Sequence, residues 1–178
     1  MKSTHHVYIG LGSNKGDRLK HLQDAVDAIF LQIGKIITIA KVYSTPALGF
    51  EGEDFLNTCM YVESNLSIQE ILLELQSIEK KIGRQPKQSA GYESRIIDLD
   101  ILLFDSDCIS TETLVVPHAE LSKRKFVLKP LCDIAGKLKH PQLEKTVAEL
   151  LEICEDDSEV TSISKWLKNP FKHFDFSM

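Results

Sequence analysis

The chain has 178 residues, of which 43% are hydrophobic and 26% are charged, and its formal net charge is −5 at pH 7. This length suffices for one domain with a substantial core, and the composition is that of an ordinary globular protein. The negative charge argues against non-specific binding to nucleic acid or to an anionic membrane, so phosphate binding would need a local cluster of cations.

Alternating apolar residues predict four strands, at residues 6–14, 35–45, 55–66 and 94–104. Helical spacing of apolar residues predicts one helix between the first two strands and one between the last two, at 16–34 and 67–83. The first strand is expected to break at Gly10 and Gly12 into a tight strand-to-helix turn, and residues 46–54 are expected to form a loop.

Capping residues support both helices. Asp17 is the expected N-cap of the first helix and Gly34 its stop, while Ser67 and Glu70 have the spacing of a capping box. Later segments are predicted as a hairpin or irregular piece at 108–118 and as two helices near 127–136 and 144–155. The tail after Val160 is either a docked extension or a frayed end.

The order of elements is β-α-β-β-α-β followed by helices. This order predicts an α+β protein with a ferredoxin-like antiparallel sheet, its two helices on one face, and additional C-terminal helices. The opposite face of the sheet is then open to a ligand, although a fold by itself does not specify a function.

The four cysteines are scattered, without a CxxC pair or a histidine at zinc spacing. We therefore expect reduced thiols rather than disulfides or a zinc site. The N-terminal stretch MKSTHHVYIGLGSN has no long apolar run, and no segment approaches the roughly 18 apolar residues of a membrane span. The sequence thus predicts a cytoplasmic protein with no membrane partner.

Two acids interrupt the fourth predicted strand, SRIIDLDILLF. Asp98 and Asp100 are two residues apart and share one face, whereas the alternating apolar residues, Ile97, Leu99, Ile101 and Leu103, are expected on the other. The pair is either an exposed acidic surface or a carboxylate pair that binds two divalent cations. Mg²⁺ favours sites with one or two carboxylates completed by substrate phosphates.

Cationic residues near these acids favour the metal-and-phosphate interpretation. Arg84, Arg95 and Arg124 would surround a metal-bound polyphosphate with groups that match phosphate geometry. Gln76 and Glu79 lie three apart on a helix near Arg84, where they either contact a nucleotide or form an ordinary solvated face. His118 either binds phosphate or makes a structural hydrogen bond.

The sequence resembles the 6-hydroxymethyl-7,8-dihydropterin pyrophosphokinases, enzymes of folate biosynthesis that move pyrophosphate from ATP to a pterin alcohol. The resemblance runs from about Val7 to Ala135 and is carried by these segments in order: YIGLGSN, VYSTPALG, FLNTCMYVE, QSIEKKIGR, SRIIDLDILLF and VPHAELSKRKFVLKPLCDIA. The R-x-x-D-x-D-I-L strand and the VPH segment are the most specific of these.

The resemblance implies a role for each candidate residue. Asp98 and Asp100 would hold two Mg²⁺ ions. The ATP-contacting positions would be Gln76, Glu79, Arg84, Arg95, His118 and Arg124, with Arg84 and Arg95 also catalytic. The pterin would bind Thr45, Pro46, Leu48, Phe55, Asn57, Asp98 and Phe126, its flat ring lying between the two aromatic side chains.

The resemblance also sets the expected boundaries and partners. Residues 1–160 would form the pyrophosphokinase domain, and the expected partners are ATP and the pterin. Residues 161–178, for which the resemblance gives no reading, are expected to form a C-terminal extension of unknown role, and the protein is expected to be a monomer. The loop 84–95 departs from the common family pattern at Pro86 and Tyr92, and it has the polar composition of a lid over ATP.

Two alternatives belong to other classes of protein. A two-metal nuclease or nucleotidyl-transfer domain of the palm type would share the element order and the acidic strand, but it would need a basic groove for nucleic acid. A non-catalytic ferredoxin-like ligand-binding module would need no arginines around the acids.

Overall fold

Strand β1 (His5–Ser13) pairs antiparallel with β5 (Asp98–Phe104) at one edge of the sheet and with the central strand β4 (Phe55–Ser64) on its other side. The far side of β4 pairs with β2 (Lys35–Ile39) and β3 (Tyr43–Thr45). This computed structural model describes residues 3–47, 49–88, 90 and 93–173. The sheet order confirms the expected antiparallel βαββαβ arrangement.

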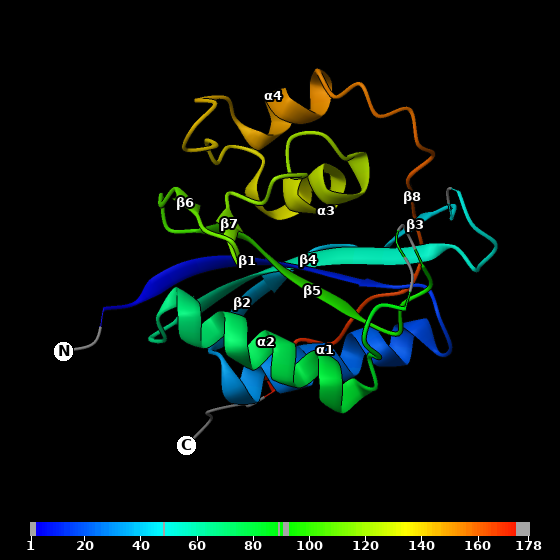
Figure 1. Ribbon diagram of the computed structural model, residues 1–178. Helices are drawn as coiled ribbons and strands as arrows, with labels where there is room; N and C mark the ends of the chain where they lie inside the picture. The colour runs from blue at the N-terminus through cyan, green and yellow to red at the C-terminus, as the bar shows by residue number, and fades with distance from the viewer. Residues whose placement is uncertain (1–2, 48, 89, 91–92, 174–178) are drawn as a thin grey trace.

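Helices α1 (Arg18–Gln32) and α2 (Ile68–Ile82) cover one face of this sheet (Figure 1). Both begin as expected: Asp17 accepts the N–H of Lys20, and Ser67 and Glu70 form a reciprocal capping box. Their apolar stripes pack on the sheet in one core cluster, which includes Leu22, Ile29, Ile71, Leu75, Ile97, Leu99 and Ile101.

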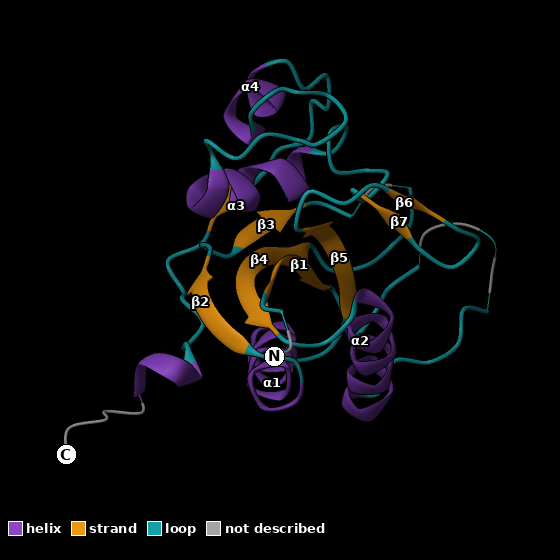
Figure 2. Ribbon diagram, turned by 90° about the vertical axis from the view of Figure 1, so that its left-hand side faces the viewer, coloured by secondary structure: helices purple, strands orange, loops and turns teal. Residues whose placement is uncertain are grey.

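The opposite face is partly covered by the C-terminal helices α3 (Lys125–Ala135) and α4 (Val147–Glu152), which Figure 2 shows on the far side of the sheet from α1 and α2. They pack on a second core cluster that includes Cys59, Leu102, Leu121, Leu128 and Leu131. The hairpin of β6 (Ile109–Ser110) and β7 (Val115–Val116) lies beside β5, and Val116 belongs to the first core cluster. A ligand can therefore bind only to the part of this face that α3 and α4 leave uncovered.

Three details differ from the sequence-based expectation. The predicted strand 35–45 is two strands, β2 and β3, because one extra residue lies between Ile39 and Tyr43 relative to the facing stretch of β4. The predicted turn at Gly10 and Gly12 is instead extended strand, paired on both sides. Leu103 lies in the second core cluster, because a bulge in β5 reverses the alternation of faces.

The tail after Val160 is docked on the domain as far as it is described. Strand β8 (Thr161–Ser162) pairs with β3, and the chain then runs to the α1 side of the sheet, where it ends in the 3₁₀ turn η1 (Pro170–His173). The side chain of Gln23 exchanges two hydrogen bonds with the backbone of Lys168, at 2.8 and 3.0 Å. All four cysteines are free. Within the described ranges no helix has the length and apolarity needed to cross a membrane.

Candidate active site

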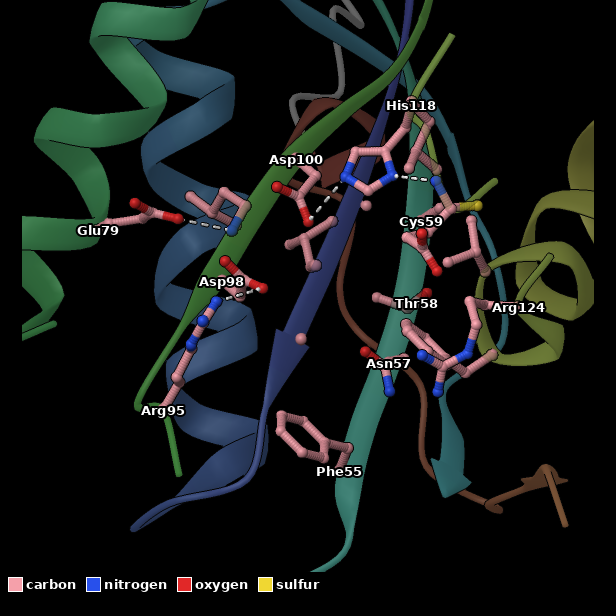
Figure 3. A pocket seen from close by; sticks show the side chains of 18 of the residues that line it. Phe55, Asn57, Thr58, Cys59, Glu79, Arg95, Asp98, Asp100, His118 and Arg124 are labelled. Carbon is pink, nitrogen blue, oxygen red and sulfur yellow. Dashed lines mark hydrogen bonds and ion pairs between the residues drawn. The ribbon is translucent and has the colours of Figure 1, made fainter. Parts of the chain in front are cut away.

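A cavity of about 550 Å³ opens where β1, β4 and β5 present their shared face between the end of α2 and the start of α3. Every expected site residue that the structure describes lines it: Thr45, Pro46, Phe55, Asn57, Gln76, Glu79, Arg84, Arg95, Asp98, Asp100, His118, Arg124 and Phe126. Leu48 lies outside the described residues, as do Gly91 and Tyr92 of the expected lid. Figure 3 shows Glu79, Arg95, Asp98 and Asp100 on one side, Asn57 and Arg124 together on the other, and Phe55 toward one end.

Asp98 and Asp100 lie on the same face of β5, and the carboxylate of Asp98 is shared by two arginines. Arg84 Nη1 donates to Asp98 Oδ1 at 2.8 Å, and Arg95 Nη1 donates to Oδ2 at 3.2 Å. Each oxygen of this carboxylate thus has one cationic partner. These contacts place two of the predicted phosphate-binding arginines directly against the acidic strand.

Asp100 has a different environment. The pKa of Asp100 is raised to about 6, because the protein around its carboxyl displaces water and because Asp98 places a second negative charge nearby. Even so, 45% of the Asp100 side chain is exposed. A carboxyl with a raised pKa gains most from a nearby positive charge, because such a charge favours its ionised form. Asp98 therefore has two arginine partners, whereas Asp100 has a longer contact with His118 and faces the cavity, where a bound cation can reach it.

His118 faces Asp100 from the segment before α3. Its Nδ1 accepts the backbone N–H of Glu120 at 3.2 Å, so the proton of the neutral ring lies on Nε2. Nε2 in turn lies 3.9 Å from Asp100 Oδ2, as the dashed line in Figure 3 indicates. The backbone contact orients the ring, which presents an N–H donor to the acidic side of the cavity.

Glu79 is buried, with 8% of its surface exposed, so it is not part of a solvated helix face. Its Oε1 accepts the backbone N–H of Leu99 at 2.8 Å and contacts Arg84 Nη1. Burial raises the pKa of its carboxyl, while the Leu99 N–H and Arg84 oppose that rise. Glu79 therefore fixes Arg84 to the acidic strand. Gln76, one turn earlier, lies on the exposed surface of α2 at the edge of the cavity.

The opposite side of the cavity is neutral and aromatic. Thr45 and Asn57 are 4% and 9% exposed, and Thr45 Oγ1 has no hydrogen-bond partner among the described residues. Phe55 lies opposite Thr45 in the pairing of β3 with β4. The ring of Phe126 lies 4.8 Å from the guanidinium carbon of Arg124, which joins the aromatic and cationic sides.

Sequence interpretation missed the floor of the cavity, which is formed by Gly10 and Gly12 of β1. Gly12 pairs with Asn57 on one side and with Asp98 on the other. A Cβ added to Gly12 would lie 2.6 Å from Asn57 Oδ1, so only glycine leaves room for that amide. The signal was present as two glycines separated by one residue in a strand, a pattern that marks close approach of another group.

Asn14 was also missed. It is 1% exposed and closes the end of β1 against the loop that carries Arg95. Its Oδ1 accepts the N–H of Arg95 at 2.6 Å, and its own N–H donates to the Arg95 carbonyl at 3.0 Å. Its Nδ2 donates to the Glu53 carbonyl at 3.3 Å, so it ties both loops beside the cavity to one strand. A single asparagine after a strand carries no sequence signal for such long-range contacts.

The donor set suits a hard cation shared with a ligand rather than a protein-only metal centre. Asp98 and Asp100 supply carboxylate oxygens, which Mg²⁺ prefers. Among the described residues no group of three or more histidine, cysteine, aspartate or glutamate side chains is placed to hold a metal ion. A cation bound here would therefore complete its coordination with water and with oxygens of a bound ligand.

Residues 8–136 match the family model described as 7,8-dihydro-6-hydroxymethylpterin-pyrophosphokinase (HPPK). The chain is 41% identical over 146 residues to the 2-amino-4-hydroxy-6-hydroxymethyldihydropteridine pyrophosphokinase of Aquifex aeolicus, covering 80% of this chain and 88% of that protein. It is 36% identical over 172 residues to the folic acid synthesis protein fol1 of Pneumocystis carinii, covering 96% of this chain but 23% of that protein.

Among solved structures, the chain is similar to the wild-type HPPK-DHPS of Plasmodium falciparum with SDX-DHP, with a TM-score of 0.72 and 16% identity. The likeness covers 85% of this chain and 44% of that one. At this identity the comparison shows the fold alone. The chain thus spans less than half of the length of the Pneumocystis and Plasmodium proteins and most of the length of the Aquifex relative.

Proposed function

The chain belongs to the 7,8-dihydro-6-hydroxymethylpterin-pyrophosphokinase family, whose members transfer pyrophosphate from ATP to 6-hydroxymethyl-7,8-dihydropterin in folate synthesis, and we propose how its cavity does so. The acidic and cationic side of the cavity binds ATP with Mg²⁺, and the neutral side binds the pterin. The observation that supports this division is that one cavity is lined both by the ionic cluster of Asp98 and by two aromatic rings and the buried Thr45 hydroxyl, which has no partner among the described residues.

Asp98 and Asp100 would hold two Mg²⁺ ions, which supply neutralisation of phosphate charge and alignment of the triphosphate when bound. The residues fit this role because the two carboxylates share a strand face, line the cavity and supply the oxygen ligands that Mg²⁺ prefers. Asp98 would become available to a metal ion when ATP binds. The phosphate oxygens can then accept the hydrogen bonds that Arg84 and Arg95 donate to Asp98 in the free protein.

In this proposal the guanidinium groups of Arg84 and Arg95 donate to Asp98 in the free protein and to the phosphates when ATP is bound. Glu79 keeps Arg84 beside the strand, and Asn14 keeps the backbone of Arg95 in place. Because both arginines are held close to their working positions before ATP arrives, little reorganisation is needed during the reaction. Gln76, His118 and Arg124 would complete the ATP side, with the Nε2–H of His118 directed at a phosphate oxygen.

The pterin would lie between Phe55 and Phe126, with its polar edge against Asn57 and the hydroxyl of Thr45. A flat heteroaromatic ring gains from faces on either side, and an amide supplies both a donor and an acceptor. Pro46 and Leu48 belong to the same proposed pocket, and Asp98 borders both sides, where it would also contact the pterin.

The pterin hydroxyl attacks the β-phosphorus of ATP, the bond from the β-phosphorus to the α–β bridging oxygen breaks, and AMP leaves. Such a transfer depends mainly on alignment and on stabilisation of charge. Arg95 and Arg84 would stabilise the charge that develops on the bridging oxygen and the phosphates. We assign no side chain as a general base.

We also propose that the enzyme acts as a cytoplasmic monomer on small-molecule substrates. Four free cysteines suit a reducing compartment. The net charge of −5 disfavours a palm-type domain that acts on nucleic acid. Light scattering of the purified protein measures its molar mass in solution and so tests whether it is a monomer.

The direct test is an incubation with ATP, Mg²⁺ and 6-hydroxymethyl-7,8-dihydropterin, followed by separation of the nucleotides. We expect AMP and a pterin diphosphate in equal amounts. ADP as the nucleotide product would instead identify an ordinary kinase. A protein that binds the pterin in a Mg²⁺-independent manner and forms no product would support a non-catalytic binding module.

A further inference from the structure

The start of α3 carries two residues of the proposed site, Arg124 and Phe126, and lacks a cap of its own. Arg124 occupies the N-cap position, and its side chain makes no capping hydrogen bond. The first backbone N–H groups of a helix have no partner within the helix, so they need an acceptor from elsewhere. What holds the start of α3 therefore also holds Arg124 and Phe126.

The acceptor is Asp156, which lies in the segment that follows α4. Its Oδ2 accepts the backbone N–H of Lys125 at 2.8 Å and the Nε–H of Arg124 at 3.4 Å. Its Oδ1 accepts the N–H of Ser158 at 3.0 Å and also contacts the Ser158 hydroxyl. Both carboxylate oxygens are engaged, and one of them caps α3 from a distant part of the chain.

Charge and burial indicate that this contact is firm. The Asp156 side chain is 10% exposed and that of Arg124 is 25% exposed, so solvent screens the pair less than a pair on the open surface. Burial alone would raise the pKa of Asp156, but hydrogen bonds from Ser158 and Lys125 and the charge of Arg124 lower it to about 2. Asp156 is therefore ionised throughout the physiological pH range.

The segment that carries Asp156 is itself attached to the core of the domain on either side. Before it, Cys154 Sγ contacts the Lys123 carbonyl at 3.6 Å. After it, Lys129 Nζ donates to the Val160 carbonyl at 2.6 Å, and β8 pairs with β3. Figure 1 shows this segment descending from α4 to the edge of the sheet at β3. Asp156 thus has a fixed support from which to act on Arg124.

We propose that Asp156 is a positioning residue for ATP: it fixes the guanidinium of Arg124 by its Nε and so directs the group at the cavity. The inference rests on the proposed role of Arg124 in ATP binding. A guanidinium on a flexible side chain loses conformational freedom when it binds phosphate, and a partner that restrains it beforehand lowers that cost. Asp156 lies outside residues 8–136, which match the family model.

The test begins with Asp156→Asn, which keeps an oxygen to accept the Lys125 N–H but loses the charge that holds Arg124. We expect affinity for α,β-methylene-ATP with Mg²⁺ to fall about three- to tenfold, the loss typical of a partly buried ion pair, with pterin affinity unchanged. The matched control is Asp133→Asn. Asp133 lies on α3, and its carboxylate accepts the hydrogen bond of the Tyr43 hydroxyl at 2.9 Å, away from Arg124. This variant should leave ATP affinity unchanged.

A double-mutant cycle with Arg124→Ala separates positioning from a general effect on the helix. If Asp156 acts through Arg124, Asp156→Asn should lower ATP affinity in the wild-type background and have no effect when Arg124 is already alanine. An equal loss in both backgrounds would overturn the inference and assign Asp156 a structural role only. Unchanged affinity in Asp156→Asn, with a loss in Arg124→Ala, would overturn the inference but leave the proposed function intact. Unchanged affinity in Arg124→Ala would overturn both the ATP role of Arg124 and the inference.

Discussion

The two sides of the cavity differ in how their polar groups are paired before any ligand binds. On the ATP side, Asp98 is paired with Arg84 and Arg95, and Glu79 is paired with Arg84. On the pterin side, the Thr45 hydroxyl is buried without a partner among the described residues. The ATP side must therefore exchange existing partners, whereas the pterin side gains partners that it lacks.

This difference predicts different consequences of mutation. Removal of one member of the ionic cluster leaves other charges unpaired and alters the groups that act in the reaction, so turnover should suffer most. Removal of a ring or a polar group on the pterin side removes a binding contact, so pterin affinity should suffer while ATP binding is kept. The division is therefore open to test by mutation of either side.

The largest effect is expected from the acids. Asp98→Ala and Asp100→Ala should each reduce AMP formation by about 10³ or more, because the reaction would lose the carboxylates that hold the metal ions, and both variants should remain folded. The control is Asp107→Ala, which removes an exposed carboxylate from the turn after β5. Near-normal activity of either pocket variant at modest Mg²⁺ would contradict the two-metal assignment.

The next largest effect concerns the arginines. Arg95→Ala should slow the chemical step by about 10²–10³, the typical loss of a preorganised charge, with a modest change in substrate affinity. Arg84→Ala should have a smaller effect, because we assign Arg84 mainly to orientation of ATP. Single-turnover kinetics on both variants measures the two rates. A larger loss in Arg84→Ala would reverse the roles.

The aromatic side chains should affect pterin binding alone. Phe55→Ala and Phe126→Ala should each weaken pterin binding by roughly 1–3 kcal/mol, the scale of a lost stacking contact with a base. Calorimetric titration with pterin and, separately, with α,β-methylene-ATP measures both affinities. If Phe126→Ala lost ATP affinity but kept pterin affinity, the division of the cavity would be wrong.

A smaller effect is expected at the floor of the cavity. Gly12→Ala would place a Cβ 2.6 Å from Asn57 Oδ1 and displace that amide, so the KM for pterin should rise about tenfold, the equivalent of a lost hydrogen bond. Gly10→Ala meets the flexible end of Leu102 at 3.2 Å and should have a weaker effect. A larger effect at Gly10 would show that Asn57 is not the group that Gly12 accommodates.

An effect of similar size, on stability rather than on substrate binding, is expected in acid. The pKa of Asp156 is about 2 in the folded protein against an ordinary value of 3.8, so ionised Asp156 stabilises the fold above pH 3.8, and this stabilisation disappears as the pH falls toward 2. Asp156→Asn should lower the free energy of unfolding by about 1–2 kcal/mol at pH 6. Urea unfolding at pH 6 and at pH 2.5 should show a difference between the variants that shrinks at the lower pH. A constant difference would contradict this linkage.

The sequence could predict the order of elements because that order depends on local patterns. Period-two alternation identified the strand of Asp98, and the capping box of Ser67 and Glu70 identified the start of α2. The resemblance to a family then connected residues that are far apart in the chain, such as Thr45 and Arg124.

Features that depend on pairing between distant segments could not be predicted in the same way. Gly10 and Gly12 were interpreted as a turn, because glycine in a short window signals a break, whereas pairing on both sides keeps β1 extended. The bulge that moves Leu103 to the other face arises from register with β1. Asn14 and Asp156 act through contacts across long sequence separations, for which a single sequence offers no local sign.

The most direct test of the account follows the fate of the β-phosphate. Wild-type enzyme, with Asp100→Ala as the inactive reference, would be incubated with pterin, Mg²⁺ and ATP labelled in the β-phosphate, and the products separated. Attack at the β-phosphorus predicts that the wild-type enzyme transfers the label to the pterin and leaves unlabelled AMP, and that the variant transfers almost none. Label retained in ADP, or equal transfer by the variant, would contradict the proposed reaction and the role of the acidic strand.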